Sequence, residues 1–596
     1  MKPTAEILEK IMENSRKNKE EIFTRLYRYM LRPDIYFIAY KNLYANDGAS
    51  TKGVNDDIAD GFSIEKIKSI IQRLTDETYM PNPVRRTYIR KNQNNSKKRP
   101  LGISSFTDKL IQEVLRMILE SVFEPTFSEY SHGFRPNRSC HTALKTLKKE
   151  FRGVIWFIEG DIKSCFERID HHILIKIINI KIKDARLIKL IWKFLKAGYM
   201  EDWEYHGTYS GCPQGNICSP ILSNIYLNEL DKFATKITKE FYKPKERRYV
   251  VEYQKNVYMK TKIKSQLKMI KGKEKTKLLK QLKFLKSETH KIPCTSKTDK
   301  VMKYIRYADD FIIGVKGNKE DCERIKLKFT EFVSQTLKME LSEEKTLITH
   351  SSEYARFLSY DIRLRRDSSV RPQGKHLART LNNTVELNIP FKDKIMPFLF
   401  HKSIIRQLQD GTIKPIARKS LYRCTDLEIV STYNSELRGK CNYYAIASNF
   451  TRLQYFAYLM EYSCLKTLAG KHKTTSMKIR NKYRVDANDW GISYTTKEGQ
   501  KYCRFAKYID CKNTNSFDDK IINYAIIHTG SRNTFEKRLS ACECELCGKK
   551  NEPLEIHHIN KVKNLKGKQL WEIVMIAKKR KTLAVCKDCH KEIHHP

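Results

Sequence analysis

Residues 303–315, KYIRYADDFIIGV, place two adjacent aspartates between two apolar runs. The runs are rich in β-branched and aromatic residues, which predicts a strand on each side of a tight turn at Asp309 and Asp310. A second stretch, GVIWFIEG at residues 153–160, predicts a buried strand that leads into Asp161. Because the side chains of adjacent turn residues diverge, one of the two turn aspartates can face the same cleft as Asp161.

Carboxylates gathered in one cleft repel one another unless a hard cation neutralises them, and Mg²⁺ prefers oxygen ligands of this kind. Two such ions about 3.5–4 Å apart can activate a nucleotide 3′-hydroxyl and stabilise the departing pyrophosphate. Adjacent aspartates alone are weak evidence, since an acidic turn is usually just a solvated turn. The neighbouring motifs are what favour a catalytic interpretation of Asp161, Asp309 and Asp310.

The composition of the 596-residue chain favours a polyanionic partner, above all nucleic acid. Lys and Arg number 114 against 68 Asp and Glu, a formal net charge of +46. With 40% hydrophobic residues, the chain is not a disordered polycation. We find no apolar run of about 18 residues and no apolar signal core in the charged N-terminal stretch. We therefore expect a cytosolic protein whose 16 cysteines are thiols or metal ligands.

Several ordered blocks surround the aspartates and extend the pattern. YADD, GDIKSCF upstream of it and GCPQGNICSPILSNIYL between them are similar to the palm of a reverse transcriptase, once an insertion at 232–300 is allowed for. Over most of residues 40–365 the chain resembles the group II intron-encoded reverse transcriptases. The further blocks that carry this resemblance are PVRRTYIRK, KKRPLGISSFTDKLIQEVLRMILESVFEPTFSEYSHGFRPNRSCHTAL and MELSEEKTLI.

The resemblance implies roles for individual residues of this chain. It assigns Asp161, Asp309 and Asp310 to a metal-binding catalytic triad that holds Mg²⁺. Phe166 matches the aromatic residue that crowds the sugar 2′-position and so selects deoxynucleotides, and Gln214 matches a residue that lines the nucleotide pocket.

Three basic residues receive nucleotide-binding roles from the same resemblance. Lys91 and Arg99 match a pair that grips the incoming triphosphate, although the loop between them is slightly long. Lys345 matches a lysine proposed to protonate pyrophosphate. A solvated or phosphate-positioning role is the alternative for each of them.

Two later regions carry basic surfaces. Residues 232–300 contain 22 Lys and Arg against 6 Asp and Glu, which predicts either a solvated helical insertion or an RNA-backbone contact. Residues 375–470 have a helical pattern where a polymerase thumb belongs, and GKCNYY and SCLKTLAGKHK within them are similar to the RNA-binding maturase region of the same family. The basic run at 466–482 is a further candidate for phosphate contacts.

The C-terminus carries two CxxC knuckles, formed by Cys544 with Cys547 and by Cys586 with Cys589. Two knuckles supply a closed tetrahedral Zn²⁺ site, and a small terminal domain is expected to need such a structural metal. The alternative is four free thiols. Cys542 lies beside the first knuckle, and we do not expect it to bind the metal.

Clustered histidines in the same segment predict a second metal site, with solvated surface histidines as the alternative. His590 and His594 are spaced i, i+4, and His557 and His558 follow an apolar stretch. The arrangement resembles the ββα fold of HNH endonucleases. That resemblance implies that His558 is a general base, that His557 and His594 hold one divalent metal such as Mg²⁺, and that His590 is a further ligand.

The sequence as a whole predicts a multidomain α/β+α fold, with a right-hand polymerase palm and fingers, a helical thumb and a C-terminal ββα-metal zinc domain. The expected divisions are fingers and N-terminal palm at 1–235, a basic insertion at 236–300, the C-terminal palm at 301–370, a thumb and maturase region at 371–475, a DNA-binding segment at 476–540 and an HNH domain at 541–596.

The implied function is that of a group II intron-encoded protein. It would copy RNA into DNA, assist splicing of its intron RNA, and nick target DNA for target-primed reverse transcription. Expected partners are the intron RNA, target DNA and dNTPs, with no membrane; a homodimer is left open. We expect a bacterial cytoplasm, with nucleoid association, or an organelle in a eukaryote. A splicing-only maturase conflicts with the intact Asp161, Asp309 and Asp310 set, and a retron or defence reverse transcriptase conflicts with the maturase and HNH segments.

Overall fold

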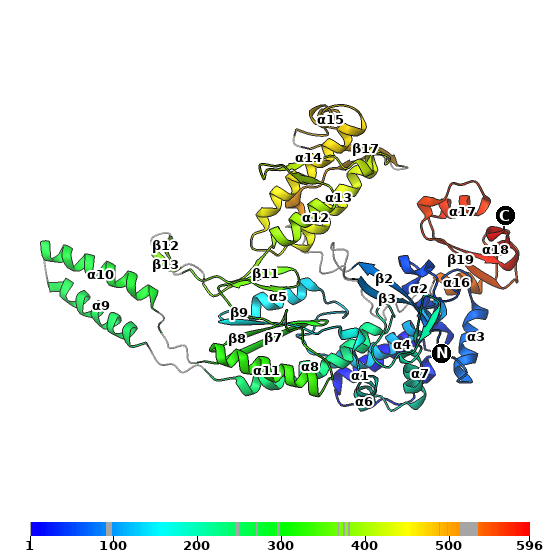
Figure 1. Cartoon of the computed structure of the whole chain (residues 1–596), viewed down its shortest axis with the longest axis horizontal. Helices are drawn as coiled ribbons and strands as arrows, with labels where there is room; N and C mark the ends of the chain where they lie inside the picture. The colour runs from blue at the N-terminus through cyan, green and yellow to red at the C-terminus, as the bar shows by residue number, and fades with distance from the viewer. Residues whose placement is uncertain are drawn as a thin grey trace.

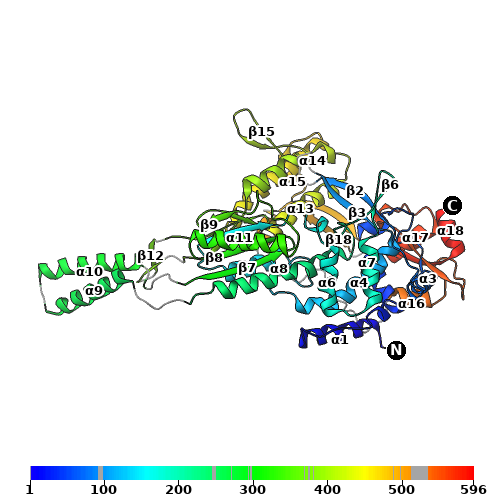
Figure 2. The same ribbon diagram turned by 60° about the horizontal axis from the view of Figure 1, so that its bottom comes forward.

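The computed structural model shows a central body of sheets and helices with a projecting helical hairpin at one end and the C-terminal unit at the other (Figures 1 and 2). None of the helices in the described residues is long and apolar enough to cross a membrane. The structure describes residues 2–90, 98–244, 250–269, 272–292, 294, 299–367, 369–373, 376–379, 382–487, 489–496, 499–511 and 534–595.

The central sheet confirms the predicted strand–turn–strand arrangement around the aspartates. Its order is β7-β8-β4-β9, and every neighbouring pair is antiparallel. In register, the last residue of β4 lies opposite the first residue of β8, so Asp161 faces Asp310 across the two strands. The strands are β7 (Val301–Tyr307), β8 (Asp310–Lys316), β4 (Trp156–Asp161) and β9 (Ile348–His350).

Two glycines allow close packing around the turn between β7 and β8. A Cβ on Gly133 would lie 2.3 Å from the backbone nitrogen of Ala308, which itself has a left-handed φ of 55°. A Cβ on Gly160 would lie 2.1 Å from the ring of Phe311. Neither position can therefore hold a side chain without moving the segment that carries the aspartates.

Helices cover both faces of this sheet. In Figure 1, α8 and α11 lie below it and α5 lies above it. The contacts of α8 with β7 and of α11 with β4 bury one apolar cluster, and the contacts of α5 with β7 bury a second cluster on the other face. The helices are α5 (Cys140–Glu150), α8 (Ser219–Phe241) and α11 (Lys319–Gln335).

A buried ion pair joins β7 to α8. Arg306 is 0% exposed, and its Nε and Nη2 donate to the two carboxylate oxygens of Asp231 at 2.8 and 2.6 Å. Nη1 of Arg306 donates to the carbonyl of Ala308 at 2.8 Å, and Tyr304 donates its hydroxyl to Asp231 at 2.9 Å. The guanidinium therefore fixes the aspartate-bearing turn relative to the helix beneath it.

A second sheet, of order β3-β2-β5-β6, lies beside an N-terminal helical layer. The strands are β2 (Val84–Arg90), β3 (Lys98–Ile103), β5 (Tyr199–Glu201) and β6 (Glu204–His206). The helices are α1 (Thr4–Lys17), α2 (Pro33–Leu43), α3 (Ile64–Thr75), α4 (Phe106–Phe123), α6 (His171–Lys181) and α7 (Ala185–Leu195).

The basic insertion forms a two-helix hairpin, α9 (Val251–Met269) and α10 (Lys273–Lys291), which projects away from the body in both views. Its base is closed by two backbone hydrogen bonds between Lys243 and Lys300, at 2.9 and 3.1 Å. Because its ends meet, the hairpin can be removed without stretching the remaining chain.

The prediction of a helical pattern over residues 375–470 is wrong for its first part, which contains short strands. Val385 and Leu387 alternate with polar residues, a period of two that is typical of a strand, and β14 pairs with β11, which also pairs with β10. The strands are β10 (Ala355–Phe357), β11 (Tyr360–Leu364), β12 (Val370–Gln373), β13 (His376–Arg379), β14 (Val385–Asn388), β15 (Ile405–Gln407) and β16 (Ile413–Pro415). The helices are α12 (Met396–His401), α13 (Asp426–Tyr443), α14 (Leu453–Lys471) and α15 (Ser476–Lys482).

The C-terminal unit shares a sheet with the N-terminal part of the chain. Its strands β19 and β20 pair with each other, and β1 adds to the outer edge of β19, so the sheet order is β1-β19-β20. A separate hairpin of β17 and β18 precedes this unit. The elements are β1 (Phe62–Ser63), β17 (Gly491–Thr496), β18 (Gly499–Arg504), α16 (Thr534–Ser540), β19 (Leu554–His558), α17 (Leu570–Lys578), β20 (Thr582–Cys586) and α18 (Lys587–His594).

We predict that Asp231→Ala destabilises the central sheet by about 3–5 kcal/mol, because it leaves the buried charge of Arg306 without its partner. The matched control is Glu229→Ala on the same helix, whose exposed pair with Lys232 contributes at most about 1 kcal/mol. Thermal unfolding, together with hydrogen exchange of the β7 and β8 amides, measures the difference. Equal exchange rates in the two variants would contradict the structural role of the pair.

Candidate functional site

The three predicted aspartates lie together at one edge of the central sheet. Asp161 ends β4, Asp310 begins β8 directly opposite it, and Asp309 precedes Asp310 in the turn. Lys345, which the sequence placed near them only by resemblance, donates its ammonium to a carboxylate oxygen of Asp161 at 2.5 Å. The structure therefore brings four of the predicted residues to one place.

Burial and mutual repulsion disfavour the charged forms of these carboxylates. Burial raises the pKa of Asp309. Burial, with a hydrogen bond to Asp161 and the charge of Asp309, raises the pKa of Asp310 to about 7. A divalent cation bound there would favour the ionised forms, and an all-carboxylate donor set suits Mg²⁺. The bond to Asp161 raises the pKa of Lys345, so this side chain stays protonated beside the acids.

A cavity of about 960 Å³ opens beside the aspartates, and Phe166, Arg99 and Gln214 all line it. Phe166 is buried and packs edge-to-face on Phe134. The Nε of Arg99 donates to the side-chain oxygen of Gln214 at 2.5 Å, which links β3 to the loop before α8. Lys91, the other predicted triphosphate contact, lies outside the described residues.

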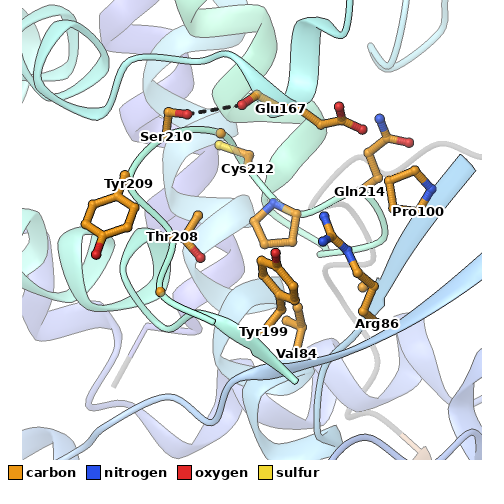
Figure 3. Close-up of a pocket in the computed structure, with 14 residues that line it drawn as sticks. Val84, Arg86, Pro100, Glu167, Tyr199, Thr208, Tyr209, Ser210, Cys212 and Gln214 are labelled. Carbon is orange, nitrogen blue, oxygen red and sulfur yellow. Dashed lines mark hydrogen bonds between the residues drawn. The ribbon is translucent and has the colours of Figure 1, made fainter. Parts of the chain in front are cut away.

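A smaller cavity of about 290 Å³ adjoins the first through Gln214. Figure 3 shows Arg86 and Gln214 on one side of it and Thr208 and Tyr209 on the other. The guanidinium of Arg86 lies 3.8 Å from the ring centre of Tyr199. Our sequence analysis did not single out Arg86, because one arginine in a strand carries no signal of what lies opposite it.

The four knuckle cysteines converge at the C-terminus. The sulfur atoms of Cys544, Cys547, Cys586 and Cys589 all lie within 4.8 Å of one another, whereas Cys542 is not among them. Burial raises the pKa of the Cys544 thiol, but backbone N–H groups of Cys547 and Cys586 outweigh it and lower that pKa to about 7. An all-sulfur donor set with a stabilised thiolate suits Zn²⁺.

A second cluster joins His557, His590 and His594 to Asp60, a residue that our sequence analysis missed. The carboxylate of Asp60 lies 3.3 Å from Nδ1 of His557, 3.1 Å from Nε2 of His590 and 2.8 Å from Nε2 of His594. No local motif could have revealed it, because Asp60 precedes β1, far from the histidines in the chain. In the described residues, this cluster and the four cysteines are the two groups of three or more ligand side chains that converge this closely.

The histidine cluster has the features of a metal site. His557 is 3% exposed, yet neither of its ring nitrogens makes a hydrogen bond. Glu555 accepts a hydrogen bond from Nδ1 of His590 at 2.6 Å, which orients that ring with Nε2 toward the cluster. Burial lowers the pKa of His590, but the bonds to Asp60 and Glu555 outweigh it and raise that pKa to about 9, so a metal must displace this proton to bind the ring.

His558 lies beside this cluster rather than in it. Its backbone N–H donates to Asp60 at 2.6 Å, and its Nε2 lies 2.9 Å from the carbonyl oxygen of Tyr44. His558 is 7% exposed, and burial lowers its pKa, so the imidazole is neutral near pH 7. The side chain predicted to act as a base therefore faces an N-terminal segment instead of solvent.

Three segments of the chain match known families. Residues 89–285 match reverse transcriptase (RNA-dependent DNA polymerase), residues 382–525 match type II intron maturase, and residues 544–590 match AI2M/AI1M-like HNH endonuclease. The first match assigns the mixed α/β core to the reverse transcriptase fold. Together these matches support polymerase and endonuclease activities in one chain.

Full-length relatives agree with these matches. The chain is 57% identical to the group II intron-encoded protein LtrA of Lactococcus lactis subsp. cremoris, over 100% of both chains. It is 34% identical to an uncharacterized 91 kDa protein in the cob intron of Schizosaccharomyces pombe, over 99% of this chain and 72% of that one. It is 31% identical to the putative COX1/OXI3 intron 2 protein of Saccharomyces cerevisiae, over 98% of this chain and 68% of that one. The chain therefore belongs to the group II intron-encoded proteins, which combine reverse transcriptase, maturase and HNH endonuclease functions.

Proposed function

We propose that the chain copies RNA into DNA at Asp161, Asp309 and Asp310, in the palm of a right-hand polymerase. The observation that carries this proposal is the register of β4 and β8, which sets Asp161 directly opposite Asp310. Mg²⁺ held by these carboxylates would activate the primer 3′-hydroxyl and stabilise the leaving pyrophosphate. Lys345, held protonated at Asp161, is placed to give a proton to that pyrophosphate.

The larger cavity is the proposed site of the incoming nucleotide. Phe166 supplies a rigid wall that would exclude a ribose 2′-hydroxyl, and Gln214, which accepts a hydrogen bond from Arg99, lines the same cavity. Arg99 can contact a triphosphate because its guanidinium keeps further N–H donors besides the one used by Gln214. We propose that Lys91 acts with it, on the strength of the family resemblance.

We propose that the C-terminal unit is a ββα HNH endonuclease with a structural Zn²⁺ on its four cysteines. His557, His590 and His594 would hold one divalent metal, which would stabilise the oxyanion that leaves when the DNA strand is cut. His558 would take a proton from the attacking water, for which a neutral imidazole is suited.

The remaining regions are proposed to bind nucleic acid. The division into fingers and palm, basic insertion, thumb with maturase region, DNA-binding segment and HNH domain keeps the boundaries expected from the sequence. The segment at 476–540 is described at residues 476–487, 489–496, 499–511 and 534–540, which include α15, β17, β18 and α16. We propose a ribonucleoprotein with the intron RNA that nicks target DNA and extends the new 3′-end with dNTPs, in the cytoplasm of a bacterium.

We predict that Asp309→Asn abolishes primer extension on an RNA template, because removal of one charge weakens Mg²⁺ binding at the three carboxylates. RNA binding should persist, since it depends on basic surfaces elsewhere. Asp202→Asn is the matched control, because Asp202 is exposed in the turn between β5 and β6. Wild-type extension by Asp309→Asn would refute the assignment of the polymerase centre.

Removal of one knuckle cysteine should unfold the terminal unit. We expect Cys586→Ala to lose bound zinc and protease resistance in residues 541–595, because a structural metal contributes directly to folding. Cys542→Ala should change neither property, since its sulfur lies outside the cluster. Zinc content and limited proteolysis of both variants test this, and a zinc-replete Cys586→Ala protein would exclude the four-cysteine site.

The projecting hairpin should contribute to the salt dependence of RNA binding. We expect that replacing residues 245–298 by a short glycine linker flattens the log–log dependence of affinity on salt, by roughly 0.7–0.9 for each phosphate that the hairpin neutralises in the wild type. The backbone pairing of Lys243 with Lys300 should keep the rest of the fold intact, which primer extension on a short template verifies. An unchanged slope would mean that α9 and α10 are a solvated surface.

A further inference from the structure

The segment between α2 and β1 runs directly over the endonuclease histidines. Its C-terminal end is fixed, because β1 pairs with β19 through Phe62 opposite Ile556, and the N–H of Gly61 donates to the carbonyl of Ile556 at 3.0 Å. Gly61 has a left-handed φ of 73°, which turns the chain sharply into the strand just after Asp60. The N-terminal part of the chain, which contains Asp60, therefore holds the Asp60 carboxylate at a defined position beside the histidines of the C-terminal unit.

Asp60 completes the donor set of the histidine cluster. Its carboxylate faces His557, His590 and His594 together, and all four ligand atoms lie within 4.8 Å of one another. Three imidazoles and one carboxylate supply four protein ligands, so fewer coordination positions remain for water and DNA than three imidazoles alone would leave. The unsatisfied ring nitrogens of His557 argue against a purely structural hydrogen-bond network, in which buried polar atoms would be paired.

The same segment covers the proposed base. Tyr44 presents its carbonyl oxygen to Nε2 of His558 at 2.9 Å, and the Ser50 hydroxyl lies 3.5 Å from Nδ1. Because a carbonyl oxygen only accepts, Nε2 carries the proton of the neutral ring, and Nδ1 is the nitrogen that would take a proton from water. A water molecule at Nδ1 would need the place that the Ser50 hydroxyl takes. Residues 44–60 therefore cover the base and the side of the cluster formed by the buried His557 and His590, while His594 stays half exposed.

We propose that Asp60 is a fourth ligand of the endonuclease metal, supplied by the polymerase half of the chain, and that it holds the nuclease centre closed. This inference rests on the proposed role of the three histidines as metal ligands. Removal of Asp60 leaves those ligands in place and opens one coordination position. It should therefore weaken metal binding and at the same time raise the rate of strand nicking at saturating metal.

The test uses the full chain bound to its intron RNA, with Mn²⁺ as the probe. Electron paramagnetic resonance counts Mn²⁺ that is coupled to imidazole nitrogen, and the all-carboxylate polymerase site does not contribute to that signal. Nicking of a labelled DNA target is measured at saturating Mn²⁺. Asp60→Ala is compared with Asp56→Ala, an exposed aspartate of the same segment that pairs only with Lys52 at 2.7 Å.

For Asp60→Ala we expect the affinity of the imidazole-bound Mn²⁺ to fall by about 10–100-fold, as for other changes around a metal site, and nicking to exceed wild type. Asp56→Ala should match wild type in both measurements. An unchanged Mn²⁺ affinity in Asp60→Ala would overturn the ligand assignment. Weaker binding with slower nicking would overturn the closed state, because Asp60 would then serve the reaction itself.

His594→Ala separates this inference from the proposed function on which it rests. His594 is 48% exposed, so its replacement should not disturb the core. If His594→Ala abolishes the imidazole-coupled signal while Asp60→Ala leaves it unchanged, only the inference about Asp60 fails. If His594→Ala keeps full Mn²⁺ affinity, the proposed endonuclease metal site itself is wrong.

Discussion

The position of the proposed polymerase centre depends on one buried ion pair, between Arg306 on β7 and Asp231 on α8. A buried pair gives little net stability, because the loss of hydration offsets much of the attraction, but removal of one partner is costly. The main effect of this pair is therefore to fix the position of β7 relative to α8. The same guanidinium holds the carbonyl of Ala308, and so the turn that presents Asp309 and Asp310 cannot shift against the helix without leaving a charge unpaired.

The chain has two opposite electrostatic requirements, positive charge for binding nucleic acid and negative charge for binding a metal ion. Its net charge of +46 favours contact with phosphates, yet the proposed polymerase centre must gather carboxylates at one point. The fold separates the two by placing the acids at a sheet edge, where burial raises the pKa of Asp309 and Asp310. Lys345 supplies a local cation in direct contact with Asp161. A divalent metal can then compete for the site without a large rearrangement of charge.

The sequence predicts those features whose signal is local. The strand–turn–strand at 303–315 and the converging cysteines follow from period-two patterns and CxxC spacing, which need no knowledge of distant residues. The strand at 385–388 was missed because four residues with a period of two are too short to stand out from flanking helices. Asp60 was missed for a different reason. It lies beside the histidines only because β1 pairs with β19, and this pairing joins two segments that are far apart in the chain.

The pairing of those two ends makes one short segment part of both active centres. Asn42, Leu43 and Asn46 line the cavity that also contains Phe166 and Gln214, while Tyr44 and Asp60 contact the endonuclease histidines. Any ligand of the cavity that shifts this segment must also change the free energy of metal and DNA binding at the nuclease, and the coupling is reciprocal. Residues 42–60 thus line the proposed nucleotide cavity at one end and contact the proposed endonuclease ligands at the other.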